Sequence, residues 1–231
     1  MKYNAIKILT LSGALAGTLL LGGCLHDDDD EISYRVELTN LSNNQPLSPA
    51  LFVLHEAGYQ AWSVGAPAGD GLERLAEGGD PGALADEARA SSAVRTVVTS
   101  SAALAPGATS VATLSGKTGA TPQLTVVTML VNTNDGFTGL GGEPLRGLTG
   151  GDSVTLFTYA YDAGTEANTE TAATVPGPAG GGEGYNPARD DTNRVTLHGG
   201  VVTSAGGLSG SALDQSHRFD NPVARVVISR Q

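Results

Sequence analysis

The sequence contains little of several residue types, and each shortage excludes a class of protein. Only one cysteine occurs in the 231 residues, so neither an intrachain disulfide nor a cysteine-based zinc site can form. The 13 lysines and arginines are outnumbered by 24 aspartates and glutamates, which gives a net charge of −11. A nucleic-acid-binding protein normally presents a basic face, so this balance argues against that function.

One apolar run stands out, and it lies at the N-terminus. Lys2 and Lys7 form a positively charged start, and an apolar stretch over residues 8–21 follows. The stretch has the length of a signal peptide and is short and glycine-rich for a membrane span. It ends in Leu-Gly-Gly-Cys at Cys24, which resembles the bacterial lipobox. We therefore expect residues 1–23 to be a lipoprotein signal peptide and Cys24 to carry the lipid. An ordinary signal peptide with an incidental cysteine is the alternative.

The residues after Cys24 predict a tether and a cellular location. Residues 24–31 include the acidic run from Asp27 to Glu31, and like charges in a row repel one another and stay solvated. We interpret this segment as a tether. Leu25 does not resemble an inner-membrane retention signal, so we expect export and lipid anchoring in the cell envelope, at the outer membrane.

The remaining residues, 32–231, predict one all-β domain. The 32 glycines are tolerated better by loop-rich β folds than by helical ones. Short helices are expected at 71–77 and 81–90, with a helical turn at 59–64. Strands are expected at 32–38, 50–55, 94–100, 109–114, 123–132, 153–161, 194–202 and 223–230. This pattern favours an antiparallel β-sandwich of eight strands, with a few short helices in the connecting loops.

A segment of unusual length runs from residue 162 to residue 193 with little strand or helix pattern. Loops this long inside a compact domain are uncommon and are often functional. Three consecutive glycines, at 180–182, predict that part of it is pliant.

Acidic residues follow the two strongest predicted strands. Asp135 lies in Asn-Thr-Asn-Asp-Gly after the first strand, and Asp162 and Glu166 lie in the turn after the second. If both strands end at the same edge, these carboxylates converge, and oxygen ligands are what calcium prefers. The alternative is that Asn, Asp and Gly only form turns. No EF-hand pattern is present.

Other candidate sites are weaker. Asp190 and Asp191 form a second acidic cluster, which is either another cation site or a solvated turn. Tyr59 and Trp62 could form a sugar platform, although a core role is the simpler interpretation. His55 ends an apolar strand, where a structural role is the more common one. The sequence has neither G-x-S-x-G nor H-E-x-x-H, so no recognisable catalytic constellation is found.

Three stretches resemble the spondin amino-terminal domain, the module of F-spondin and mindin. They are VTMLVNTNDGFTGL at 127–140, TLFTYAYDAGT at 155–165 and PVARVVISR at 222–230. The turn Tyr-Asp-Ala-Gly-Thr is the most specific of these features. The likeness extends to residues 34–40 and 50–62.

The resemblance implies an eight-stranded antiparallel β-sandwich that binds calcium through loop carboxylates. By this resemblance Asp135, Asp162 and Glu166 are the ligands. The sequence departs from the animal pattern at Asn134 and Gly136, which replace a proline and an aromatic residue. No acid near residues 115–118 matches a further family ligand, so Asn132, a backbone carbonyl, Glu166 or water would replace it.

These observations predict a non-catalytic, calcium-binding recognition or adhesion module anchored to the bacterial envelope through Cys24. Its partners are expected to be the membrane and a protein or glycan at a cell surface. Two alternatives remain open: an envelope hydrolase acting on glycan or lipid, and a purely structural envelope lipoprotein.

Overall fold

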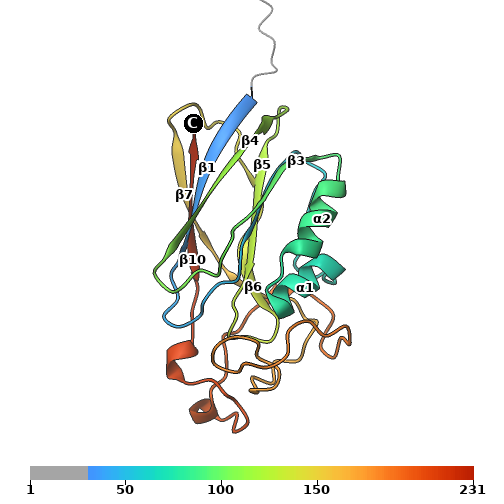
Figure 1. Cartoon of the computed structure of the whole chain (residues 1–231), viewed down its shortest axis with the longest axis vertical. Helices are drawn as coiled ribbons and strands as arrows, with labels where there is room; N and C mark the ends of the chain where they lie inside the picture. Colours follow the sequence, from blue (N-terminus) through green and yellow to red (C-terminus); the bar gives the residue numbers. More distant parts are fainter. Residues whose placement is uncertain (1–30) are drawn as a thin grey trace, which may run out of the picture.

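The computed structural model describes residues 31–231, which form an antiparallel β-sandwich with two short helices on one side (Figure 1). The expected signal peptide, Cys24 and the tether up to Asp30 lie outside the described residues. Glu31, expected to end the tether, is instead the first residue of the first strand and pairs with Lys117. In this described part of the chain, no helix has the length and hydrophobicity needed to cross a membrane.

One sheet has four strands in the order β4-β1-β10-β7. Their bounds are Thr109–Lys117 for β4, Glu31–Asn40 for β1, Ala224–Arg230 for β10 and Ser153–Thr158 for β7. All the pairings are antiparallel. The C-terminal strand β10 is thus a central strand, between the first strand and β7.

The second sheet has six strands in the order β3-β2-β5-β6-β8-β9. Their bounds are Val94–Thr99, Leu51–His55, Gln123–Met129, Gly136–Pro144, Ala160–Asp162 and Thr196–Leu197, in that order. The sandwich prediction is confirmed, but the described residues contain ten strands rather than eight. The chain crosses from the first sheet to the second between β7 and β8, which splits the strand expected at 153–161.

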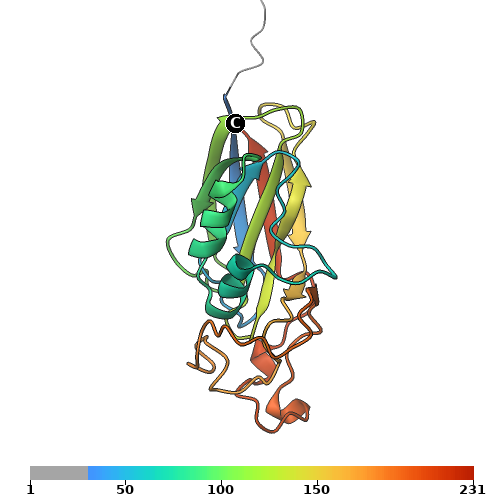
Figure 2. The same cartoon turned by 90° about the vertical axis from the view of Figure 1, so that its right-hand side faces the viewer.

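The strongest apolar runs are continuous because both faces of the second sheet are covered. Phe52 and Leu54 of β2 point into the core between the sheets, whereas Leu51 and Val53 point to the other face. There they belong to a second apolar cluster that includes Leu72 of α1 (Asp70–Gly78), and this helix and α2 (Gly82–Ala90) cover that face (Figure 2). Because both faces of such a strand are buried, its sequence does not alternate between apolar and polar residues.

Three sequence-based assignments are wrong. The strand expected at 194–202 is reduced to the two residues of β9. The turn at 59–64 is not a helix; Trp62 is a core residue whose ring lies 5.3 Å from that of Phe137 and covers Gly141. Strand β6 was missed because its sequence, GFTGLGGEP, has four glycines, which disfavour strands by propensity. The packing of β6 against its neighbours requires small residues, and these tertiary contacts override the low strand propensity of glycine.

The two ends of the sandwich differ. The start of β1 and the C-terminus lie at one end, and the long connections at residues 163–195 and 198–223 lie at the other (Figures 1 and 2). We refer to this second end as the loop end. It also contains the turn between β5 and β6, so all three acids identified from the sequence are found there.

Gly139 provides a test of the close approach between β5 and β6. A Cβ atom at this position would overlap the backbone carbonyl oxygen of Val126, and neither backbone can move without breaking the sheet. We expect Gly139→Ala to lower the free energy of unfolding by about 3 kcal/mol. The control is Gly150→Ala, where a Cβ meets nothing within 4 Å. Urea denaturation of both variants checks this, and equal midpoints would contradict the packing described.

Candidate metal centre

Asp135 lies fully buried in the turn between β5 and β6, and it joins that turn to the next loop. Its Oδ2 accepts hydrogen bonds from the backbone N–H of Thr165 at 2.7 Å and of Glu166 at 3.2 Å. Its own carbonyl oxygen accepts the N–H of Ala163 at 3.2 Å. The Thr133 hydroxyl closes the turn by accepting the N–H of Gly136 at 2.9 Å. The Asp135 side chain is therefore held in one place by backbone groups.

Asp162 ends β8 directly opposite Gly136 of β6, so the sheet register places it beside Asp135. Its Oδ1 accepts the N–H of Gly164 at 2.7 Å, and its Oδ2 accepts the amide of Asn168 at 2.6 Å. Both oxygens thus already hold the turn in shape. Each retains a lone pair, since a carboxylate has about four acceptor positions.

Glu166 completes the predicted set and is 7% exposed. Its Oε1 accepts the side-chain amide of Asn134 at 3.2 Å. Asn134, which departs from the family pattern, thus connects the first loop to the second. The structure places the three sequence-predicted acids at the same end, on two adjoining loops.

Unpartnered oxygen atoms are the most informative feature of this region. Asp135 Oδ1 and Glu166 Oε2 are buried and have no hydrogen-bond partner in the described part of the protein. Burial, with the charge of Asp162 nearby, raises the pKa of Asp135 to about 7. Burial also raises the pKa of Glu166 to about 8, with Glu77 and Asp135 adding to the effect. A buried carboxylate oxygen without a partner requires a proton or a cation.

Two further acids belong to this region and were not predicted. Glu77, in α1, is 1% exposed and has one unpartnered oxygen; its other oxygen accepts the N–H of Asn186 at 2.9 Å. Glu170 is also 1% exposed with one unpartnered oxygen, and its backbone N–H donates to Asn134 Oδ1 at 3.0 Å. Burial raises the pKa of Glu170 to about 7.

Helical spacing gave no signal for Glu77, because it follows Leu72 by five residues and Leu75 by two and therefore lies on another side of α1. It is buried under the long loop, from which Asn186 donates to its Oε2. Glu170 gave no signal either. It lies in an irregular loop and adopts a φ of 56°, which is uncommon for a residue other than glycine.

Cations near these acids are few. Arg189 donates to Glu73 Oε2 at 2.6 Å, and this bond raises the pKa of the arginine. Glu73 thus has a cationic partner. No salt bridge to Asp135, Glu166, Glu77 or Glu170 is formed within residues 31–231.

The long loop, predicted to be pliant in part, is instead packed against the sandwich. Arg189 binds Glu73 of α1, and the Tyr185 ring lies 4.0 Å from the guanidinium of Arg74. At Gly180 and Gly182 a Cβ atom would overlap backbone carbonyl groups of the same loop. These two glycines allow close packing of the loop on itself, so the prediction of pliancy from 180–182 is not supported.

The other candidate residues have structural roles. Asn132 donates to the carbonyl of Asn44 and accepts the N–H of Ala179, both at 3.0 Å, so its side chain ties loops together. Asp190 is exposed and accepts the N–H of Ala167 at 2.8 Å, as expected of a turn residue. His55 is buried and bonds Thr125 Oγ1 at 2.9 Å.

The chemistry available here is cation binding by oxygen atoms. Over residues 31–231, no group of three or more His, Cys, Asp or Glu side chains is positioned to hold a metal ion by itself. An ion would therefore take carboxylate oxygens from at most two of these acids, of which Asp135 and Glu166 have unpartnered oxygens, and backbone oxygens or water for the rest. Calcium accepts such mixed sets of six to eight oxygen ligands.

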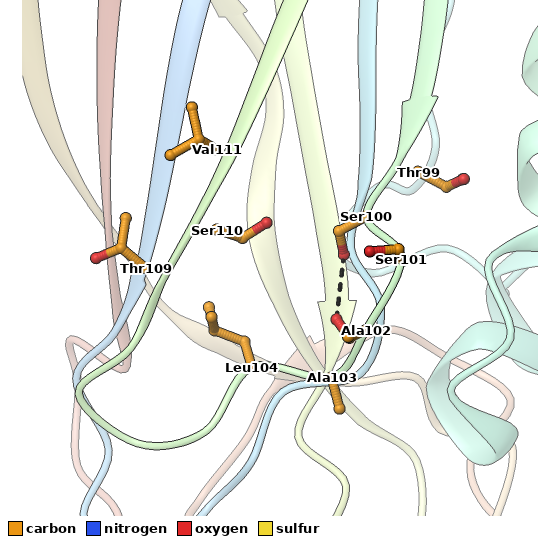
Figure 3. A pocket seen from close by; sticks show the side chains of 9 residues that line it. All are labelled: Thr99, Ser100, Ser101, Ala102, Ala103, Leu104, Thr109, Ser110 and Val111. Carbon is orange, nitrogen blue, oxygen red and sulfur yellow. Dashed lines mark hydrogen bonds between the residues drawn. The ribbon is translucent and has the colours of Figure 1, made fainter.

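Three hollows in the described part of the chain are lined by residues other than these acids. The hollow of about 430 Å³ in the connection from β3 to β4 is lined by serine, threonine and small apolar side chains (Figure 3). Its only internal hydrogen bond shown there joins Ser100 to the carbonyl of Ala102. Two further hollows are lined by residues between 121 and 146 and between 199 and 218. Asp135, Asp162 and Glu166 line none of the three.

Comparison with known proteins gives a family match. The model of the Spondin_N family matches residues 40–177, which is more than half of the chain. A search of curated proteins found no match. The matched span contains Asp135, Asp162 and Glu166, and it stops short of the Pro-Val-Ala-Arg-Val strand at the C-terminus. Spondin_N domains are non-catalytic modules of extracellular type. The chain therefore belongs to the spondin amino-terminal domain family.

Proposed function

We propose that this protein is a non-catalytic, calcium-binding recognition or adhesion module, anchored to the outside of the bacterial cell through a lipid on Cys24. The observation that carries the proposal is the pair of buried, unpartnered oxygens, Asp135 Oδ1 and Glu166 Oε2. They lie on two loops already joined by hydrogen bonds to Asp135 Oδ2. A calcium ion would give both oxygens a partner.

Calcium accounts for these acids better than protonation alone does. Asp135, Asp162 and Glu166 together carry three negative charges when ionised, and Glu77 and Glu170 lie near them. Like charges in a buried site repel, and the repulsion grows as burial removes water. A divalent cation removes most of this repulsion between the carboxylates. When bound, calcium supplies charge and fixed geometry to the two loops; the protein's own residues supply the oxygen ligands.

The anchoring part of the proposal rests on the leader. The positive start, the apolar stretch and the Leu-Gly-Gly-Cys ending support lipid attachment at Cys24, and Leu25 supports the outer membrane. The first strand begins at Glu31, at the end of the sandwich opposite the acidic loops (Figure 1). An anchor at Cys24 would thus present the loop end away from the membrane, where a protein or glycan partner could reach it.

A hydrolase is the less well supported function. Raised carboxyl pKa values occur in catalytic sites. Here the carboxyls are buried, and none of the three hollows is lined by them. An empty calcium site and a buried cluster of protonated carboxyls would both show raised carboxyl pKa values. Only the calcium site would be stabilised by added calcium.

Calcium titration of the chelator-treated protein, with thermal melts, is the direct test. We expect saturable binding, and stabilisation of about 2.7 kcal/mol when calcium is at 100 times its Kd. This corresponds to roughly 5–10 °C in melting temperature for a chain of this size. Magnesium at the same concentration serves as the control, since it fits irregular oxygen sites poorly. Absence of heat and of any shift would overturn the proposal.

The pH dependence gives a second prediction. The folded-state pKa values of Asp135 and Glu166, about 7 and about 8, lie above the ordinary values of 3.8 and 4.5. The folded state therefore binds more protons, and stability without calcium falls as pH rises from about 5 to about 8. Added calcium should restore stability most at about pH 8 and least at about pH 5. A calcium effect that does not change with pH would contradict this linkage.

Asp135→Asn separates the ion site from a purely structural role. The asparagine carbonyl can accept the N–H bonds from Thr165 and Glu166, while the buried charge is removed. We expect unchanged or higher stability without calcium, and calcium affinity at least about tenfold lower, about 1.4 kcal/mol. Asp191→Asn is the matched control. It removes the same charge from the long loop, at a side chain with no hydrogen bond to another described residue. Equal calcium affinity in both variants would remove Asp135 from the site.

Asp162→Asn should affect both calcium binding and the structure of the loop. The two Asp162 oxygens accept hydrogen bonds from Gly164 and Asn168, so the NH2 group that replaces one oxygen would face another donor. We expect weaker calcium binding together with faster amide hydrogen exchange in the loop from 162 to 193. Calcium affinity equal to that of the unchanged protein would show that Asp162 is not a ligand.

A further inference from the structure

A second hollow, of about 380 Å³, lies at the tip of the loop end. It is formed by the segment from 199 to 206 and by Gln215 and Arg218. The connection at residues 198–223, which contains this lining, is orange to red at the bottom of Figures 1 and 2. Pockets of this volume are at the small end of those that hold small molecules. Neither the predicted metal ligands nor the long acidic loop lines it.

The lining of this tip pocket is rich in hydrogen-bond donors and has no carboxylate. Arg218 and Gln215 are exposed into it, and neither side chain bonds another described residue. The backbone N–H groups of Val201, Thr203 and Ala205 donate to no acceptor in residues 31–231. The hollow at residues 121–146 also contains a glutamine and an arginine and no carboxylate, but its volume is only about 180 Å³.

No acid forms a salt bridge with Arg218 within residues 31–231. The carboxylate next to the lining is Glu170, which accepts the N–H of Val202 at 3.2 Å. In the sequence between Val195 and His217 the only carboxylate is Asp214. Its Oδ1 accepts the N–H of Ser216 at 2.9 Å and lies 2.9 Å from His217 Nδ1, within its own turn. Asp220, on the other side, accepts the N–H of Asn221 at 3.1 Å. The guanidinium of Arg218 is thus left with its donors available.

Both walls of the tip pocket are fixed to the core. The short helix η2 (Gln215–His217) is closed by a capping box between Asp214 and His217, and the buried Gln45 donates to the carbonyl of His217 at 2.9 Å. On the opposite wall, next to the short helix η1 (Ser204–Gly206), Val202 N–H donates to Glu170 at 3.2 Å. Anchored walls make the pocket a preformed feature, which lowers the entropy lost on binding.

We propose that the tip pocket binds a small polar ligand through an oxyanion group, held by the Arg218 guanidinium. Arginine presents a planar set of donors that matches a carboxylate, sulfate or phosphate with two parallel hydrogen bonds. Gln215 and the free backbone N–H groups supply further donors for hydroxyl or oxyanion oxygens. The volume exceeds that of a bare inorganic anion, and Val202, 46% exposed, offers an apolar contact. An acidic monosaccharide therefore fits the pocket best.

The proposal does not depend on calcium, so its test is carried out in calcium-free buffer. The purified full-length protein is titrated with glucuronate, sulfate, phosphate and, as a neutral control, glucose, and ¹H–¹⁵N spectra are recorded. We expect glucuronate to shift the amides of Val201 and Thr203 and the side-chain N–H of Arg218 and Gln215, at concentrations on the order of 10 mM or lower. Glucose should leave them unchanged.

Arg218→Gln removes the charge and should weaken glucuronate binding at least tenfold. Because the side chain bonds no other described residue, its melting temperature should be unchanged. Arg194→Gln, an exposed arginine outside the pocket, is the matched control and should bind as the unchanged protein does. Equal shifts with sulfate and phosphate would support an oxyanion pocket without sugar preference. Absence of shifts with every anion, or equal affinity in the Arg218 and Arg194 variants, would overturn the proposal.

Discussion

Asp135 is held fully buried by backbone N–H groups of the neighbouring loop, and this fixes a carboxyl group where water does not reach it. The rest of the loop end is arranged around that constraint. Glu166 follows because its own N–H belongs to the Asp135 contact, and Asn134 ties Glu166 and Glu170 to the same turn. Asp135, Glu166 and Glu170 each keep one buried oxygen without a partner in residues 31–231. The structure thus concentrates carboxyl groups at one end of the sandwich, and burial raises the pKa of each of these three.

The sequence predicted the sandwich because its strongest strands carry an unambiguous signal. Runs such as LFVLH in β2 are apolar throughout, since one set of side chains faces the inter-sheet core and the other faces α1. Strand β6 gave no such signal, because close packing on β5 selects glycine, a residue with low strand propensity. The prediction of a helical turn at 59–64 was wrong because it relied on local periodicity, whereas contacts with Phe137 determine the position of Trp62.

The candidate site was predictable to the extent that its residues follow strong strands. Asp135, Asp162 and Glu166 stand next to β5 and β8, so the family resemblance and the sheet edge both indicated them. Glu77 and Glu170 come from a helix and from an irregular loop, and only the tertiary fold brings them near. The loop from 162 to 193 shows the same limit. Its glycines suggested pliancy, whereas contacts with α1, such as Arg189 with Glu73, decide its order.

The position of β10 has a consequence for how the protein is made. This last strand of the chain lies between β1 and β7, and the residue pairing with β1 runs from Tyr34 to Asn40. Before residues 224–230 have been synthesised, only the β4-β1 pair of the first sheet can form, and β7 has no partner in that sheet. Closure of the four-stranded sheet therefore depends on a pairing between segments almost 200 residues apart in the sequence, from Tyr34 to Arg230. Pairings of such large sequence separation form slowly, so we expect completion of this sheet to be a late step in folding.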